Sequence, residues 1–167
     1  MNETCLRDGV FVSKDHPRII LRGALDSLQA DILEAQVLVM EKNEPAAEPA
    51  DKRFVGGGSR PVDYYVDALG EILEFVRELM SAEVNERPVA QKKLFGFSLD
   101  ELHEQSHKLK MPVYTMGAFP VRLNTLRTRV RETELIAVRT FREPQRDDIV
   151  HALNRLSSAV YWLFCQY

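Results

Sequence analysis

Apolar side chains recur every three or four residues through most of this 167-residue chain, and this spacing constrains the fold more than any other feature. Such steps place side chains on one stripe of a helix, whereas a half-buried strand would alternate every second residue. The pattern predicts four long helices and one short one: Pro17 to Glu41, Pro61 to Asn85, about Ser98 to Lys110, a helix after the Pro112–Pro120 turn region that ends near Phe141, and one from Asp147 to the C-terminus. With no alternating strands, we expect an all-α fold, a helix bundle of these five helices, with residues 1–167 as a single domain.

The same stripes predict which side chains form the core. The first helix is expected to bury Ile20, Leu25, Leu28, Ile32 and Val39. The second helix is expected to bury Val62, Tyr65, Leu69, Ile72, Val76 and Leu79, and the last helix Ile149, Leu153, Leu156, Val160 and Leu163. A chain of this length can bury about 70% of its unfolded surface, so it needs no disulfide or metal to stay folded.

Composition excludes several classes of function. The net charge of −3 and the sparse aromatics give no basic field for a nucleic acid. No apolar run approaches the twenty residues of a membrane span, and no signal peptide is apparent at the N-terminus. The lone cysteines Cys5 and Cys165 form neither a disulfide framework nor a metal pattern. We therefore expect a cytoplasmic protein with reduced thiols.

Two segments fall outside the helical pattern. Residues 1–12 lack clear periodicity and are expected to be either a mobile arm or a loop folded over a site. Residues 42–60 contain two prolines and a triple glycine, Gly56–Gly58, and are expected to form a flexible loop between helices. A phosphate loop is rejected here, because no strand precedes the glycines and no Gly-Lys-Ser/Thr follows them.

Three helix starts carry recognisable signals. Asp15 can cap the first helix, with Pro17 in its first turn. Ser98-Leu-Asp-Glu101 is a capping box for the short helix, and Asp147 can cap the last one.

A charged stripe marks the helix before the last. Arg127, Arg131 and Glu134 stand at i, i+4 and i+7 beside an apolar stripe of Leu126, Val130 and Ala137. Such a stripe is often only a solvated face with ion pairs. The last helix, however, also places polar groups where core is expected, at Asn154, Ser157 and Ser158. Asp26 on the first helix is either simply exposed or a charge partner for one of the arginines.

The short helix contains His103-Glu104-Gln-Ser-His107, which matches the zinc-hydrolase pattern H-E-x-x-H. A catalytic zinc needs a third ligand, and neither His16 nor His151 stands at a spacing that supplies one. The neighbouring residues are those of an exposed polar helix. We interpret the match as an accident of sequence and predict no metal site.

Several blocks together resemble the cobalamin adenosyltransferases, specifically the ethanolamine-utilisation type. They are Ser13-Lys-Asp-His-Pro-Arg-Ile-Ile-Leu-Arg-Gly-Ala-Leu-Asp-Ser27, Phe95-Gly-Phe-Ser-Leu-Asp-Glu-Leu-His-Glu-Gln-Ser-His107, Leu126-Arg-Thr-Arg-Val-Arg-Glu-Thr-Glu134 and Ala152-Leu-Asn-Arg-Leu-Ser-Ser158. The resemblance covers most of the chain from Val12 onward. It implies a five-helix bundle, usually a homotrimer with active sites between subunits, that transfers the 5′-deoxyadenosyl group of ATP to the cobalt of cob(I)alamin.

The resemblance also implies roles for individual residues. Lys14 and Arg131 resemble the residues that contact the ATP phosphates, with Mg²⁺ expected alongside them. Glu134 and Asn154 resemble the residues next to the nucleotide. Arg127 and Asp26 resemble an arginine–aspartate pair that shapes both the subunit contact and the site. The catalytic set is therefore Arg127, Arg131 and Asp26, and the binding set is Lys14, Arg131, Glu134 and Asn154.

The chain departs from the family pattern at its N-terminus. Residues 1–11 contain no Thr-Lys-Thr-Gly-Asp type phosphate loop and no upstream histidine with clustered cysteines. The alternative hypothesis is therefore a helical bundle that binds ATP or a corrinoid without catalysis. The apolar residue that displaces the lower cobalt ligand is not assigned, and its candidates are Leu109, Met111, Tyr114 and Phe119.

Overall fold

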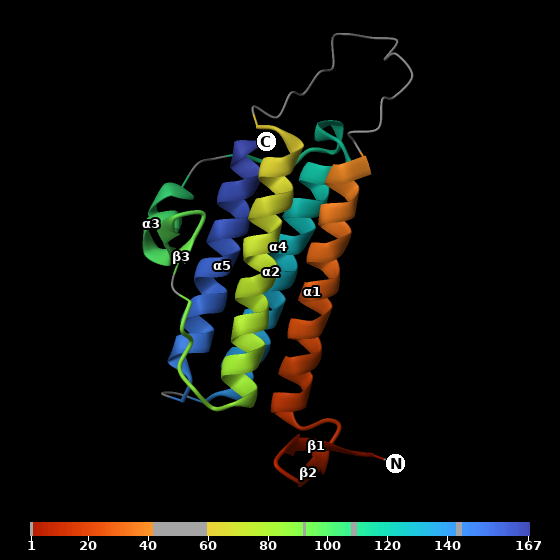
Figure 1. The fold of residues 1–167 in the computed structure, drawn as a ribbon, viewed down its shortest axis with the longest axis vertical. Helices are drawn as coiled ribbons and strands as arrows, with labels where there is room; N and C mark the ends of the chain where they lie inside the picture. The colour runs from red at the N-terminus through yellow and green to blue at the C-terminus, as the bar shows by residue number, and fades with distance from the viewer. Residues whose placement is uncertain (1, 42–59, 92, 108–109, 143–144) are drawn as a thin grey trace.

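Four long antiparallel helices form the bundle (Figure 1). The computed structural model describes residues 2–41, 60–91, 93–107, 110–142 and 145–167. The long helices are α1 (Pro17–Glu41), α2 (Val62–Val84), α4 (Ala118–Thr140) and α5 (Asp147–Gln166), joined by the short α3 (Leu99–Gln105) and the 3-10 helix η2 (Tyr114–Met116). Two small hairpins add strands β1 (Glu3–Arg7), β2 (Val10–Ser13), β3 (Lys93–Leu94) and β4 (Phe97–Ser98). The predicted all-α bundle is confirmed, and the loop predicted at 42–60 lies, apart from Arg60, outside the described residues.

The core follows the predicted stripes with one error. The residues predicted inward on α5 are all buried, as are those on α2 after the half-buried Val62. On α1 the prediction for Ile20 is wrong, because Ile20 is 47% exposed and its neighbour Leu21 enters the core instead. Three consecutive apolar residues precede Arg22, so the local pattern does not fix which of them faces inward.

Two of the three predicted caps are wrong. The capping box at Ser98 is present, with the Ser98 hydroxyl accepting from Glu101 N–H and the Glu101 carboxylate accepting from Ser98 N–H. At α1, however, the ring Nδ1 of His16, not Asp15, accepts the N–H of Arg18 at 3.3 Å. At α5 the N-cap is Arg146, in a left-handed conformation at φ 60°, and Asp147 is already helical. The short helix also ends at Gln105, five residues before the predicted end.

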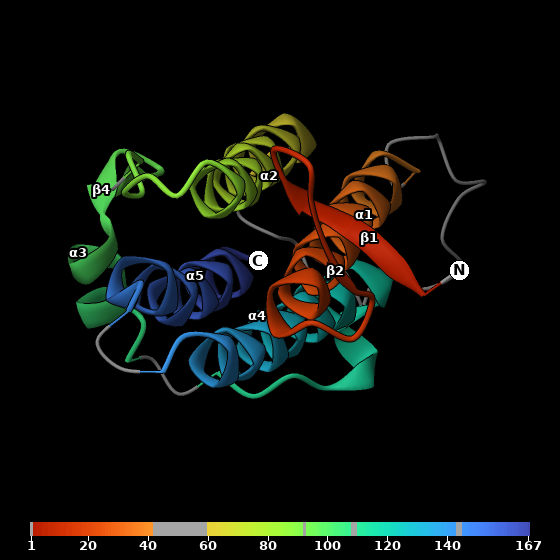
Figure 2. The same ribbon diagram turned by 90° about the horizontal axis from the view of Figure 1, so that it is seen from below.

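The N-terminal segment forms an antiparallel hairpin across the end of the bundle, where sequence indicated an arm or a loop (Figure 2). Its turn residues Asp8 and Gly9 have φ of 44° and 81°, the conformation that an Asp-Gly hairpin turn favours. Arg22 fastens the hairpin to the bundle by donating from Nη1 to the carbonyl of Leu6 at 2.7 Å.

A buried carboxylate holds this end of the bundle together. Glu83, near the end of α2, is fully buried and forms ion pairs with the Nε groups of Arg18 and Arg22 on α1. Arg18 also donates to Glu86, which in turn pairs with Arg7 of β1. A buried charge is tolerated only when it is paired, so this network fixes the ends of α1, α2 and the hairpin relative to one another.

Candidate active site

Two of the polar side chains predicted on the last two long helices meet between α4 and α5, which lie side by side (Figure 1). The amide of Asn154 donates to the carboxylate of Glu134 at 2.9 Å. Its carbonyl oxygen accepts from Nη1 of Arg155 at 2.9 Å, and Arg155 also donates from Nε to Asp100 at 2.7 Å. An amide offers two N–H groups and two lone pairs, so Asn154 keeps one of each for a ligand.

The two predicted arginines of α4 differ in their surroundings. Arg127 is half-buried, with its guanidinium 5.6 Å from the ring centre of Tyr161 on α5 and its Nε donating to Asn124 at 3.3 Å. Arg131, one turn further along, is exposed, and in the described part of the chain no carboxylate or carbonyl pairs with its guanidinium. The structure therefore offers a free cation directly between Arg127 and Glu134 on the stripe.

The serines of α5 have structural partners. Ser157 donates to the carbonyl of Asn154 at 2.7 Å, and Ser158 lies 2.9 Å from Nδ1 of His103 on α3. Burial lowers the pKa of His103, and the nearby charge of Arg155 lowers it further. The hydroxyl of Ser158 therefore serves to join α3 to α5.

The two histidines of the H-E-x-x-H match lie at different places, His103 on α3 and His107 just beyond the end of that helix. One ring nitrogen of His103 is occupied by Ser158, and the His103 ring packs edge-on against His107. No group of three or more His, Cys, Asp or Glu side chains in the described ranges is arranged to hold a metal ion.

Lys14 and Asp26 lie apart from this α4–α5 cluster. Lys14 is exposed between β2 and α1, at the end of the bundle that carries the hairpin. Asp26 is exposed on α1, and within the described chain its carboxylate pairs with no arginine. One chain thus places Arg127, Arg131 and Glu134 on one stripe of α4, joins Glu134 to Asn154, and leaves the other two predicted residues on separate surfaces.

Sequence analysis missed Arg155 and Tyr161, which support this cluster. Tyr161 stands seven residues beyond Asn154 and so lies on the same side of α5, whereas Arg155 is the residue next to Asn154 and has no such spacing. That spacing could have identified Tyr161 as a neighbour of the arginine stripe.

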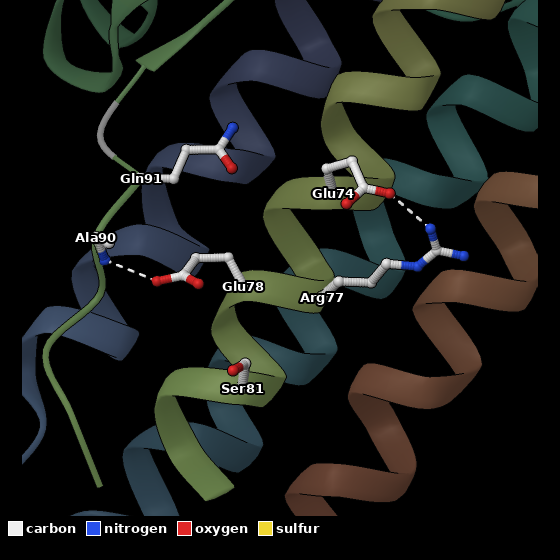
Figure 3. Close-up of a pocket in the computed structure, with 6 residues that line it drawn as sticks. All are labelled: Glu74, Arg77, Glu78, Ser81, Ala90 and Gln91. Atoms are coloured by element: carbon white, nitrogen blue, oxygen red, sulfur yellow. Dashed lines mark hydrogen bonds and ion pairs between the residues drawn. The ribbon is translucent and has the colours of Figure 1, made fainter. Parts of the chain in front are cut away.

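A groove of about 580 Å³ lies between α2 and the segment that follows it, and the charged side chains that line it pair with groups of the same chain (Figure 3). Glu78 accepts from Arg87 at 2.6 Å and from the N–H of Ala90 at 2.8 Å, and Glu74 pairs with Arg77. The charges of the described residues that line this groove are therefore satisfied within the chain, and none of these residues is a free cation for an anionic substrate.

The family model for cobalamin adenosyltransferases matches residues 1–167, the whole chain. The chain belongs to the cobalamin adenosyltransferase family. It is 33% identical to the corrinoid adenosyltransferase EutT of Salmonella typhimurium and 32% identical to EutT of Escherichia coli K12, in each case over 90% of this chain and 53% of the relative. The chain thus spans about half the length of the curated relatives it matches, and no solved structure matches it.

The residues considered for displacing the lower cobalt ligand differ in accessibility. Phe119 is fully buried against Tyr65 and Tyr167 in the core. Met111 is 76% exposed, Tyr114 at the start of η2 is 89% exposed, and Leu109 lies outside the described residues. Met111 and Tyr114 are therefore accessible at the surface of this chain, and Phe119 is not.

None of the described helices is both long and apolar enough to cross a membrane.

Proposed function

We propose that this chain is an ATP:cob(I)alamin adenosyltransferase that moves the 5′-deoxyadenosyl group of ATP to cobalt. The cobalt(I) electron pair attacks C5′, the cobalt–carbon bond forms, and the C5′–oxygen bond breaks to release triphosphate. The observation that carries the proposal is the unpaired guanidinium of Arg131 beside the hydrogen-bonded Glu134 and Asn154, in a chain of this family.

The proposed reaction requires the alignment of C5′ with cobalt and the stabilisation of the charge on the leaving triphosphate. Cobalt(I) is already a strong nucleophile, so no general base is needed, and the site must hold C5′ in line with cobalt and stabilise the leaving triphosphate. We assign the triphosphate to Arg131 and Lys14, and the nucleoside to Glu134 and Asn154. The free N–H and free lone pair of Asn154 suit recognition of a polar nucleotide edge.

Mg²⁺ is proposed to accompany the phosphates of ATP. Mg²⁺ keeps several waters and often takes only one or two protein carboxylates in addition to phosphate oxygens. Such an ion would therefore be held mainly by phosphate oxygens and water, and no residue of this chain is assigned as its ligand.

We further propose a homotrimer in which Asp26 of one subunit pairs with Arg127 of its neighbour. Within one chain Asp26 is exposed, and the same side of α1 carries the exposed apolar residues Leu33 and Val37 at i+7 and i+11. On α4, Leu135 and Val138 are also exposed beside the arginine stripe. Apolar side chains on both helices support burial against a second copy, and such an interface would complete the site.

The cytoplasm is the proposed compartment. Cys5 and Cys165 are both free thiols, as expected in a reducing environment.

An anaerobic assay tests the proposal. Chemically reduced cob(I)alamin, Mg²⁺ and ATP are mixed with the protein, and conversion to adenosylcobalamin is followed by absorbance. Arg131→Ala is expected to lower kcat roughly 100-fold or more, because a preorganised charge at the leaving group is lost. Arg139→Ala, an exposed arginine further along α4, serves as the control and should stay near wild type. Wild-type kinetics in Arg131→Ala would contradict the assigned role.

The second candidate is a bundle that binds its ligands without catalysis. The observation that favours it is the N-terminal segment, which lacks the family's phosphate loop and forms the β1–β2 hairpin instead. Tight binding of adenosylcobalamin by folded protein, with no product in the assay, would support this candidate.

A further inference from the structure

A second pocket, of about 340 Å³, lies between α2, the β3–β4 hairpin and α5. Figure 2 places this hairpin on the side of the bundle away from α1. We call this pocket the aromatic pocket. Its lining residues are Arg60, Tyr64, Asp67, Ala68, Glu71, Phe95, Phe97 and Trp162. None of them belongs to the proposed adenosyltransferase site.

Three rings from two elements form one wall of the aromatic pocket. The ring of Phe95 stacks on Trp162 with centres 5.3 Å apart and planes at 18°, and Phe97 lies 5.8 Å from Trp162 at 58°. The indole N–H of Trp162 is directed to Gln105 of α3 at 3.3 Å, which fixes the orientation of the ring. The wall therefore presents fixed aromatic surfaces to the pocket.

The position of Phe95 involves backbone strain. Phe95 and Gly96 form the two-residue turn between β3 and β4, with φ of 55° and 82°. A bulky residue rarely adopts positive φ, and Asn or Gly would fit this turn without strain. The N–H of Phe95 donates to Glu71 at 2.7 Å, which holds the turn against α2. Strain kept in place by surrounding contacts often marks a functional position.

The other lining residues include two exposed carboxylates, those of Asp67 and Glu71. Glu71 accepts only the single N–H of Phe95, and in the described residues no side chain pairs with Asp67. The guanidinium of Arg60 lies 5.1 Å over the Tyr64 ring, so the pocket already holds one cation of its own chain against an aromatic face. Aromatic faces attract cations, and nearby carboxylates strengthen this preference.

We propose that the aromatic pocket binds an organic cation, meaning an ammonium or guanidinium group with a small apolar body. The aromatic rings contact the apolar body and the cationic group of the ligand, and the carboxylates of Asp67 and Glu71 balance its positive charge. The guanidinium of the exposed Arg60 competes with the ligand for the same position in the pocket. The proposal is independent of the adenosyltransferase assignment.

The single tryptophan of the chain, Trp162, provides the readout. Tetramethylammonium is titrated into the full-length protein while Trp162 fluorescence is recorded, with tert-butanol as a neutral probe of similar shape. A saturable change is expected with the cation in the millimolar range and not with the alcohol. No saturable change, or an equal response to both probes, would overturn the proposal.

Variants separate charge recognition from simple apolar binding. Asp67→Asn and Glu71→Gln are each expected to weaken tetramethylammonium binding by roughly threefold, whereas Arg60→Ala should strengthen it by a similar factor. Glu74→Gln, on the same helix but in the separate groove of Figure 3, is the control and should bind as wild type does. Wild-type affinity in both Asp67→Asn and Glu71→Gln would overturn the assignment. Because Asp67 has no partner to lose, its variant is expected to fold normally.

Discussion

The side-chain amide of Asn154 donates a 2.9 Å hydrogen bond to the carboxylate of Glu134 and so joins the middle of α5 to α4. This bond orients both groups beside the free guanidinium of Arg131. In the proposed site, the side chains of Asn154 and Glu134 would be held in place before any nucleotide binds. The entropy lost in ordering these side chains on binding would therefore be smaller.

Loss of the Asn154 side chain is expected to weaken ATP binding. Asn154→Ala should raise the Kd for ATP about tenfold, because one hydrogen bond to the ligand is lost and Glu134 loses its orienting partner. Calorimetric titration with Mg²⁺ and ATP measures this. Ser157→Ala is a matched control on the same helix, since its hydroxyl bonds only the backbone carbonyl of Asn154. An unchanged Kd in Asn154→Ala would refute its role in binding.

The two carboxylates at the end of α2 should differ sharply in their effect on stability. Glu83→Ala is expected to lower the free energy of unfolding by about 3–5 kcal/mol, because it leaves Arg18 and Arg22 without the buried partner they share. Glu86→Ala should cost much less, because Glu86 is nearly half exposed and its ion pairs are screened by solvent. Urea denaturation of both variants tests the comparison, and equal losses would contradict it.

Glu78 is expected to make stability depend on pH in the acid range. Its hydrogen bond from Arg87 lowers its pKa below the ordinary value of 4.5, with help from the N–H of Ala90. A carboxyl whose pKa is lowered on folding stabilises the protein above its unfolded pKa and loses that contribution as pH falls through the folded pKa.

The variants Glu78→Gln and Glu74→Gln isolate that contribution. Above about pH 5, Glu78→Gln should be less stable than wild type by about 1–2 kcal/mol, and the difference should shrink as the solution is acidified below pH 4. Glu74→Gln removes an exposed ion pair with Arg77, one turn earlier on α2. Its difference from wild type in the free energy of unfolding should be smaller and should change less with pH. A gap between wild type and Glu78→Gln that widens at low pH would contradict the assignment.

The proposed subunit contact is testable by charge reversal. Asp26→Arg and Arg127→Asp should each shift the protein from trimer toward monomer, because like charges then face each other across the interface. The double variant should recover at least part of the trimer. Sedimentation velocity gives the distribution of species. If the wild type is a monomer, or if the double variant is no better than either single one, the proposed pair is wrong.

The sequence predicted those parts of the fold that depend on local periodicity. The 3.6-residue repeat of apolar side chains specifies α1, α2 and α5 to within a few residues, and the core follows from it. The error at Ile20 occurs where three consecutive apolar residues offer equivalent choices, and the caps predicted at Asp15 and Asp147 each miss the helix start by one residue.

Contacts between distant segments were not predictable in the same way. The β1–β2 hairpin depends on Arg22 and on the Glu83 network, which bring together residues more than sixty positions apart. Two local signals were nevertheless present. Asp8-Gly9 is a favoured hairpin turn, and Glu83 continues the apolar stripe of α2 at four residues beyond Leu79, where a carboxylate requires a buried partner.

The candidate site was only partly accessible to sequence analysis. The spacing of Arg127, Arg131 and Glu134 correctly placed them on one stripe, and Glu134 meets Asn154. The positions of Lys14 and Asp26 within one chain do not bring them to this stripe, so their proposed roles depend on how copies of the chain assemble, which periodicity does not encode.

The shared carboxylate of Glu83 also limits how this protein can change over evolutionary time. Neither Arg18 nor Arg22 can be replaced alone without leaving Glu83 short of a partner, and Glu83 cannot be replaced without leaving two guanidinium groups unbalanced. Positions 18, 22 and 83 are therefore expected to be inherited as a set. A lineage that abandons the set should also abandon the N-terminal hairpin, because Arg22 is one of the residues that fasten it to the bundle.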